Sequence, residues 1–385
     1  MEGVVTNHWM MRLVIVLLLA AGLLTAVTVV AGRGQVPIGG NDRALSPGDS
    51  FIYLFDSTTS SFIFTFTIPT TNANAWDVEV VPLASAYEVW VTEPGADQIG
   101  RLVYTSTSDY AYEPFLLPSG SYPLNLQVDD DYVWFTAPGR NLIGRLNRTD
   151  YSVDEFEVPT VNSYPADLAV TQDGRVWFTQ MRADQLASLV VDSSGTYTVT
   201  EYQGATMERG RPYGIVVSQL VVSGKPMEAV FIAQTQNDRV TRYIPDTDRW
   251  LDLYNWVSAD RQIPDGPYKL TLGPDGQLWG TGREGGAIYS FGYGTYPIVG
   301  NYTVLPLHSS PHSLVSDSSR RIWFTQYGAA QLGRLTPGSP ALRDYYPLPG
   351  NGVNPTGIDL GGADHIWISA FRAHRVHLPI VVRNL

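Results

Sequence analysis

A short phrase built around an aromatic residue recurs seven times along this chain. Its clearest copies are residues 133–137, 176–180 and 322–326, which read VWFTA, VWFTQ and IWFTQ. An aliphatic residue follows nine positions after every aromatic anchor. The anchors stand 43 to 54 residues apart and are Trp90, Trp134, Trp177, Phe231, Trp279, Trp323 and Trp367. Self-similarity at this period indicates a fold made of equivalent, stacked units.

Each repeat reads as four short strands. A proline opens most repeats, an alternating strand such as 166–170 follows, and a turn such as Gln172-Asp173-Gly174 leads into the aromatic strand. An Asp-Gly pair between alternating runs is a strong hairpin signal. Third and fourth strands such as 142–146 and 156–159 complete the unit. Four antiparallel strands per repeat are the signature of a propeller blade, so the sequence predicts an all-β, seven-bladed β-propeller.

The ring of blades has to be closed, because an open end would expose long strand edges. The last repeat ends with residues 376–382, which we assign to its third strand. The run at 62–68 precedes the first repeat, and we expect this N-terminal strand to supply the missing fourth. A second strand-like run, residues 51–55, is not assigned to a strand position in any blade. The propeller domain is therefore predicted over residues 51–385.

The N-terminus carries twenty uncharged, mostly apolar residues, from Leu13 to Gly32. Such a run predicts one apolar helix, and we assign residues 1–32 to a signal peptide or a transmembrane anchor. A cleaved signal has a shorter apolar run and a small-residue site, whereas about twenty residues suffice to span a bilayer. Residues 33–50 are rich in Gly, Pro and Asp and are predicted to be a linker. Both alternatives predict an extracytoplasmic protein, secreted or membrane-anchored.

Composition excludes several classes of function. The chain has no cysteine, so disulfides, thiolate metal sites and cysteine nucleophiles are ruled out. Its formal net charge of −12 argues against nucleic acid as a partner, because phosphate binding needs a basic surface.

The predicted topology brings two sets of positions to one end of the central channel. The start of the first strand and the end of the second are neighbours in a hairpin, so both should surround this mouth. Convergent polar groups in a concavity are the default site hypothesis. The predicted ligand-binding residues of the mouth are Trp76, Glu93, Gln180, Tyr213, Gln234, Tyr268, His312 and Gln326.

The wording Pro-x-x-Leu, Asp-Gly, Trp-Phe-Thr-Gln and Leu-Gly-Arg-Leu resembles the virginiamycin B lyase (streptogramin lyase) family over roughly residues 75–377. That resemblance implies a seven-bladed propeller that opens a cyclic lactone by Mg²⁺-assisted elimination. It implies a site with one histidine, then a Glu-x-His pair and the glutamate of a Trp-Phe-Thr-Glu phrase on the next blade. In this chain those positions read Tyr268, Ser310-Pro311-His312 and Gln326, so only His312 matches.

These departures favour a binding or scaffolding module over an enzyme. A glutamine cannot act as a general base, and it is a weak Mg²⁺ ligand without carboxylates beside it. On this interpretation no metal or other cofactor is expected, and the partner is a small molecule or a protein held at the mouth.

Two alternatives remain open. One is a C–O lyase or hydrolase that acts on a cyclic ester or similar small molecule, with His312 as the catalytic residue, Glu93 or Tyr268 as its partner, and Mg²⁺ as cofactor. The other is an accessory subunit of a membrane complex, held in the membrane through the segment from Leu13 to Gly32.

Overall fold

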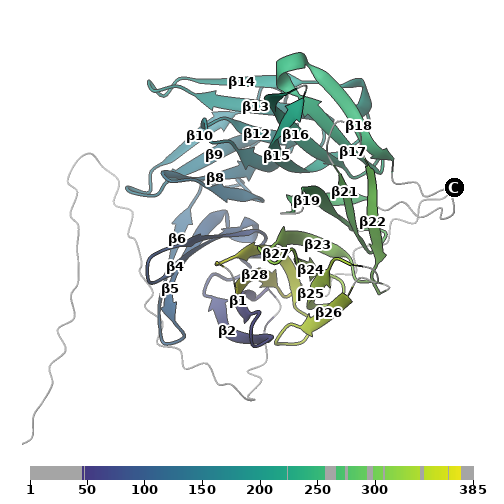
Figure 1. Cartoon of the computed structure of the whole chain (residues 1–385). Coiled ribbons are helices and arrows are strands. Elements are labelled where there is room, and N and C mark those ends of the chain that lie inside the picture. The colour runs from purple at the N-terminus through teal and green to yellow at the C-terminus, as the bar shows by residue number, and fades with distance from the viewer. Residues whose placement is uncertain are drawn as a thin grey trace, which may run out of the picture.

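The computed structural model describes residues 46, 48–222, 224–255, 266–273, 276–292, 298–306, 308–338, 342–362 and 364–373. These residues form seven four-stranded antiparallel sheets arranged as blades around one axis (Figure 1). The predicted all-β, seven-bladed propeller is therefore confirmed.

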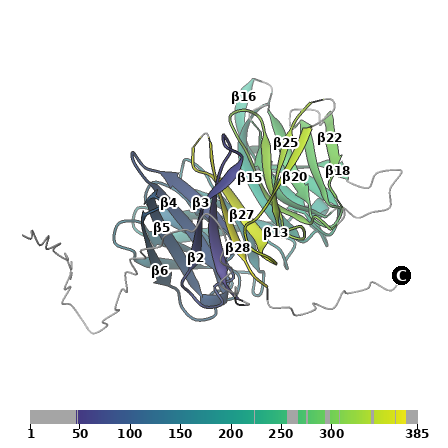
Figure 2. The same ribbon diagram turned by 90° about the horizontal axis from the view of Figure 1, so that it is seen from below.

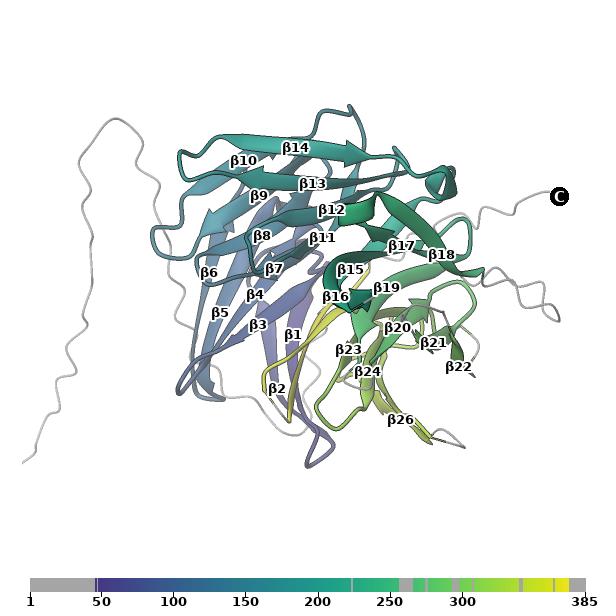
Figure 3. The same cartoon turned by 45° about the horizontal axis from the view of Figure 1, so that its top comes forward.

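Six blades are built from consecutive strands, with the first strand nearest the axis (Figure 3). Blades one and two contain β3 (Val78–Pro82), β4 (Tyr87–Glu93), β5 (Gln98–Ser106), β6 (Asp109–Leu116), β7 (Leu126–Val128), β8 (Tyr132–Ala137), β9 (Leu142–Asn147) and β10 (Val153–Glu157). Blades three and four contain β11 (Pro165–Val170), β12 (Val176–Gln180), β13 (Gln185–Val191), β14 (Tyr197–Tyr202), β15 (Pro212–Val222), β16 (Lys225–Gln234), β17 (Arg239–Ile244) and β18 (Arg249–Asn255). Blades five and six contain β19 (Pro267–Leu272), β20 (Gln277–Gly282), β21 (Ala287–Gly292), β22 (Ile298–Val304), β23 (Pro311–Ser316), β24 (Ile322–Gln326), β25 (Gln331–Thr336) and β26 (Leu342–Pro347). Within the described ranges, three short 3₁₀ turns lie in the connections: η1 (Pro94–Ala96), η2 (Ala205–Met207) and η3 (Pro245–Thr247).

The seventh blade joins the two ends of the propeller. Its inner strands are β27 (Asn354–Leu360) and β28 (His365–Phe371), and its outer strands are β1 (Ser50–Asp56) and β2 (Ser61–Ile68) (Figure 2). The prediction that residues 62–68 supply the fourth strand is confirmed. The assignment of residues 376–382 to the third strand of this blade is wrong. The third strand is β1, which pairs with β28 along its whole length. Residues 374–385 themselves lie outside the described part of the chain.

The aromatic anchors are buried between blades. Trp90, Trp177, Trp323 and Trp367 are fully buried. The Trp323 ring, for example, packs against Phe55 of the neighbouring blade, with ring centroids 5.7 Å apart. Burial of such large side chains stabilises each blade-to-blade contact, which is why the anchor recurs in every repeat.

The predicted apolar helix from Leu13 to Gly32 lies outside the described residues. Across the part of the chain that the structure describes, no helix has the length and apolar character needed to cross a membrane.

A candidate ligand-binding mouth and central channel

The threonine of the repeated phrase ties each blade to the next. The Thr325 hydroxyl donates to the carbonyl oxygen of Thr356 at 2.7 Å and accepts a hydrogen bond from the Ser313 amide at 3.0 Å. Equivalent pairs of hydrogen bonds are made by Thr92, Thr136, Thr179, Thr281 and Ser369. Each accepting carbonyl lies at the start of the inner strand of the following blade, and three of them belong to the predicted mouth residues Trp76, Tyr213 and His312. We call each of these hydrogen-bonded hydroxyl residues a clamp, and the clamps position the mouth. In blade four, Ala233 stands where the other blades have the clamping threonine or serine.

Four predicted mouth residues meet across the axis and close the channel. The indole N–H of Trp76 donates to the Tyr213 hydroxyl at 3.3 Å, and the rings of Tyr213 and Tyr268 stack with centroids 4.1 Å apart. The His312 ring lies 4.9 Å from both Tyr268 and Trp76. We call these four residues the mouth plug. The predicted gathering of aromatic and histidine side chains is therefore present, but as a seal rather than an open concavity.

Two arginines, Arg182 and Arg283, lie against aromatic rings of the plug or of residues next to it. The guanidinium of Arg283 lies 4.7 Å from the ring centroid of Tyr268 and 5.8 Å from that of Tyr327, while Arg182 lies 4.5 Å from the ring of Tyr164. Such contacts are favourable cation–π interactions. Tyr164 and Met181 pack against the plug. We call Tyr164, Arg182, Arg283 and Tyr327 the rim. None of them was predicted as a mouth residue, because the prediction used only the starts of the first strands and the ends of the second strands.

His312 is a neutral base with one free nitrogen. Its Nδ1 lies 3.1 Å from the Thr356 carbonyl oxygen, so Nδ1 carries the proton and Nε2 keeps its lone pair. Nε2 is buried and has no hydrogen-bond partner in the described structure. Burial, together with the cations of Arg283 and Lys269, lowers the pKa of His312 well below its usual value.

The surroundings of His312 do not suit Mg²⁺. The two charged groups that act on the imidazole, Arg283 and Lys269, are both cations. Mg²⁺ requires oxygen ligands, usually with one or two carboxylates. Among the described residues, no three His, Asp or Glu side chains are grouped so as to hold a metal ion.

The four predicted mouth residues at the ends of the second strands do not join the plug. Glu93, Gln180, Gln234 and Gln326 are fully buried inside their blades. They are hydrogen-bonded respectively to Gln98, Glu201, Thr241 and Gln331 of their own sheets. Successive residues of a strand face opposite sides, so the residue after each clamping threonine points away from the next blade. Burial also raises the pKa of Glu93, whose carboxylate accepts hydrogen bonds from Tyr112 and Gln98.

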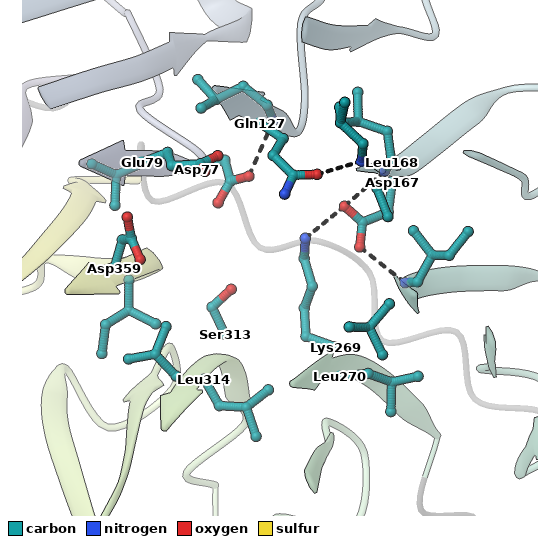
Figure 4. A pocket seen from close by; sticks show the side chains of 18 of the residues that line it. Asp77, Glu79, Gln127, Asp167, Leu168, Lys269, Leu270, Ser313, Leu314 and Asp359 are labelled. Atoms are coloured by element: carbon teal, nitrogen blue, oxygen red, sulfur yellow. Dashed lines mark hydrogen bonds and ion pairs between the residues drawn. The ribbon is translucent and has the colours of Figure 1, made fainter. Parts of the chain in front are cut away.

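Below the plug lies a cavity of about 280 Å³, lined by the inner strands of all seven blades (Figure 4). Its charged lining residues are Asp77, Glu79, Asp167, Lys269 and Asp359. The Lys269 ammonium pairs with Asp167 at 2.9 Å. The predicted mouth did not include these residues, although Asp77 and Lys269 each follow directly after a predicted mouth residue, Trp76 and Tyr268.

A bulge in the inner strands explains why consecutive residues both reach the axis. The pairing of β23 with β24 shifts register between Pro311 and Leu314, and the same shift occurs in β11, β15, β19 and β27. A bulge interrupts the alternation of side chains. His312 can therefore belong to the plug while Ser313, the next residue, lines the cavity.

The carboxylates of the channel cap the free edges of the inner strands. Asp359 accepts a hydrogen bond from the Val80 amide of the next blade at 2.7 Å. Equivalent bonds run from Leu126 to Asp77, Val128 to Glu79, Val170 to Gln127 and Ile215 to Asp167. An innermost strand has no strand partner on the axial side, so its buried amides need such acceptors. These polar residues therefore have a structural role.

Burial in the channel disfavours the ionised forms of its charged residues. Burial, and then the charge of Asp359, raise the pKa of Glu79 well above its usual value. Burial, with a contribution from Asp77, raises the pKa of Asp359 to about 7. The pKa of Asp77 is also raised by burial, although Lys269 opposes this. Burial opposes the charge of Lys269 as well, but Asp167 and Asp77 outweigh it and raise the lysine pKa.

Comparisons with known proteins agree with the architecture. The model of the virginiamycin B lyase family matches residues 57–248 and 258–378. A streptogramin B lyase structure is similar with a TM-score of 0.62 at 21% identity, over 84% of this chain and 98% of that one. Virginiamycin B lyase from Staphylococcus aureus gives a TM-score of 0.61 at 20% identity, over 83% of this chain and 99% of that one. A protein from Lactobacillus plantarum gives 0.58 at 12% identity, over 77% and 94%. A search of curated proteins found no match.

At these identities the solved structures show the fold alone, whereas the family model covers most of the sequence. This chain belongs to the virginiamycin B lyase family.

Proposed function

We propose that this propeller is a binding module that holds a ligand or a protein partner at its mouth and does not perform the lyase reaction. The observation that carries this proposal is the environment of His312. Its imidazole is enclosed by the plug and flanked by the cations of Arg283 and Lys269. Gln326, at the position where the family resemblance implies a glutamate, is bonded to Gln331 inside its blade. Metal-assisted elimination needs carboxylates beside the base to hold the Mg²⁺ ion, whereas the charged groups that act on His312 are both cations.

The rim indicates the chemistry of the bound group. Tyr327 and Tyr164 offer aromatic faces, and Arg283 and Arg182 place positive charge over such faces. Aromatic rings stack on such surfaces, and guanidinium groups bind carboxylates. The proposed ligand is therefore an aromatic group with an attached anion, on a small molecule or on a protein.

Binding of 3-phenylpropionate, observed by ligand-detected NMR, tests the proposal. We expect binding that is weakened at least fivefold by Arg283→Gln. The matched control is Arg320→Gln, which alters an exposed arginine outside the rim. Equal binding by both variants, or no binding to the unaltered protein, would overturn the assignment of the rim.

A second candidate function is supported by the free Nε2 of His312. A neutral imidazole with an unused lone pair is able to abstract a proton next to a carbonyl once a substrate opens the plug. The reaction class would be C–O elimination or hydrolysis of a cyclic ester. Quinupristin with Mg²⁺ is a suitable probe, since a structural relative is described in complex with quinupristin. Ring opening seen by chromatography and lost in His312→Ala would favour this candidate and contradict the first.

We propose in addition that the protein works outside the cytoplasm, secreted or anchored through residues 13–32. The twenty uncharged residues support this proposal. Mass spectrometry of the mature N-terminus, together with protease accessibility on intact cells, tests it. A peptide that retains residues 13–32 indicates an anchor, and a start after residue 32 indicates a cleaved signal. Complete protection from external protease, with no protein released to the medium, would contradict export.

A further inference from the structure

The central cavity is separate from the mouth and carries an excess of negative charge. The plug closes its upper end, and the lining residues begin directly below the plug on the same strands. Lys269 is engaged with Asp167, whereas Asp77, Glu79 and Asp359 form no ion pair with a cation in the described structure. Each accepts one amide hydrogen bond, and a carboxylate has further lone pairs on both oxygens. These three carboxylates therefore keep acceptor capacity toward the cavity.

Ser313 supplies an independent sign that the cavity takes a ligand. Its hydroxyl points into the space between Asp359 and Lys269 (Figure 4). The residue as a whole is 6% exposed, and no hydrogen bond joins its hydroxyl to another residue in the described part of the chain. A hydroxyl that faces a cavity and has no protein partner is available to a ligand.

We propose that the cavity binds a small organic ammonium ion, with the ammonium group lying among the carboxylates of Asp77, Glu79 and Asp359 and near the Ser313 hydroxyl. We call this the channel site. An ammonium donates three hydrogen bonds and neutralises the clustered charge. The cavity of about 280 Å³ corresponds to roughly nine water-sized heavy atoms, which is more room than a bare metal ion needs. Val216 and Val315 give the cavity apolar walls that suit a short aliphatic chain.

Charge relief supports the same occupant. Burial and mutual repulsion raise the pKa values of Glu79 and Asp359, so their ionised forms are disfavoured without a counter-ion. A bound ammonium stabilises the ionised forms, and binding should release protons at neutral pH. The channel site is independent of the rim, so its test does not depend on the proposed function.

Titration calorimetry at pH 8.5 with butylammonium chloride tests the channel site, with sodium chloride added to keep the ionic strength constant. We expect saturable binding of one butylammonium per chain. The variants Asp359→Asn and Glu79→Gln keep an acceptor for the strand amide but remove the charge, and each should weaken binding about tenfold. Glu157→Gln, which alters an exposed carboxylate of β10, and Arg283→Gln at the rim should both leave it unchanged.

Three results would overturn the channel site. The first is that butylammonium produces no heat beyond that of sodium chloride. The second is that the unaltered protein and the Asp359→Asn variant bind butylammonium equally. Calcium chloride titrated in a separate arm would bind where butylammonium does not, which would indicate a metal ion instead. Thermal unfolding of each variant checks folding; since the two channel variants remove like-charge repulsion, we expect their Tm to be equal to or above that of the unaltered protein.

Discussion

The indole Nε1 of Trp76 lies 3.3 Å from the hydroxyl oxygen of Tyr213, so side chains from the start of blade one and from blade four meet across the propeller axis. This contact divides the axial space into two parts. On one side lies the arginine-bearing rim, and on the other lies the acidic cavity, which contains the ion pair between Lys269 and Asp167. The two parts differ in charge and therefore call for different ligands.

The Tyr213 hydroxyl should contribute measurably to stability. It accepts hydrogen bonds from Trp76 and from the buried amide of Asn125, both at 3.3 Å. Tyr213→Phe removes this acceptor, and we expect a loss of about 1–2 kcal/mol in the free energy of unfolding. Urea denaturation measures it. The control Tyr197→Phe, at an exposed tyrosine, should change stability little, and equal losses in both variants would contradict a special role for the plug.

Loss of one clamp should weaken a whole blade interface. Thr325→Val keeps the shape of the side chain but leaves the Ser313 amide without its partner, and the Thr356 carbonyl keeps only the hydrogen bond from His312. An orphaned buried group costs about 1–3 kcal/mol. We expect a clear fall in Tm, measured by calorimetry. Thr149→Val alters an exposed threonine in a turn and should leave the Tm nearly unchanged; a similar Tm for both variants would show that the clamps are dispensable.

Breaking the ion pair of the channel should be strongly destabilising. Lys269→Met leaves the Asp167 carboxylate buried beside Asp77 without its cation. Removing one partner of a buried pair typically costs about 3–5 kcal/mol. The double variant Lys269→Met/Asp167→Asn removes both charges, and we expect it to recover part of that loss in chemical denaturation. A double variant less stable than the single one would contradict the pairing.

Stability should decrease as the pH rises toward neutrality. Burial raises the pKa of Asp359 from 3.8 to about 7, and that of Glu79 is raised as well. A carboxyl group with a raised pKa in the folded state binds its proton more tightly when folded. Its contribution to stability is complete below pH 3.8 and is lost as the pH rises through about 7. We expect Asp359→Asn to reduce the difference in Tm between pH 5 and pH 8; an unchanged difference would contradict this assignment.

The N-terminal strands should be essential for closure. A chain that begins at Thr70 lacks β1 and β2, so only β27 and β28 of blade seven remain. A two-stranded sheet is marginal by itself, and β28 would present an open edge. We expect loss of the cooperative thermal transition, measured by circular dichroism. A chain that begins at Ser46 retains both strands and should unfold cooperatively; similar transitions in the two chains would refute closure by β1 and β2.

The repeat alone was sufficient to predict the seven blades, because nearly every blade uses the same residues at its contact with the next blade, with blade four, which has Ala233 in place of the threonine, as an exception. The buried anchor Trp323 and the clamp Thr325 are two residues apart, so one short sequence phrase contains both residues that form the contact with the next blade. Closure was predictable for β2 but not for β1. Both β1 and residues 376–382 read as strands, and only the pairing with β28 decides between them.

The mouth was predictable in part. Tyr268 and His312 come together because both follow the proline that opens an inner strand. Gln326 does not, because its direction depends on which face of its strand packs against the next blade. The channel residues were hidden from sequence analysis, since a bulge in the inner strands turns two consecutive residues toward the axis. Strand identity thus follows from the local repeat, whereas side-chain direction and charge proximity are properties of the closed ring.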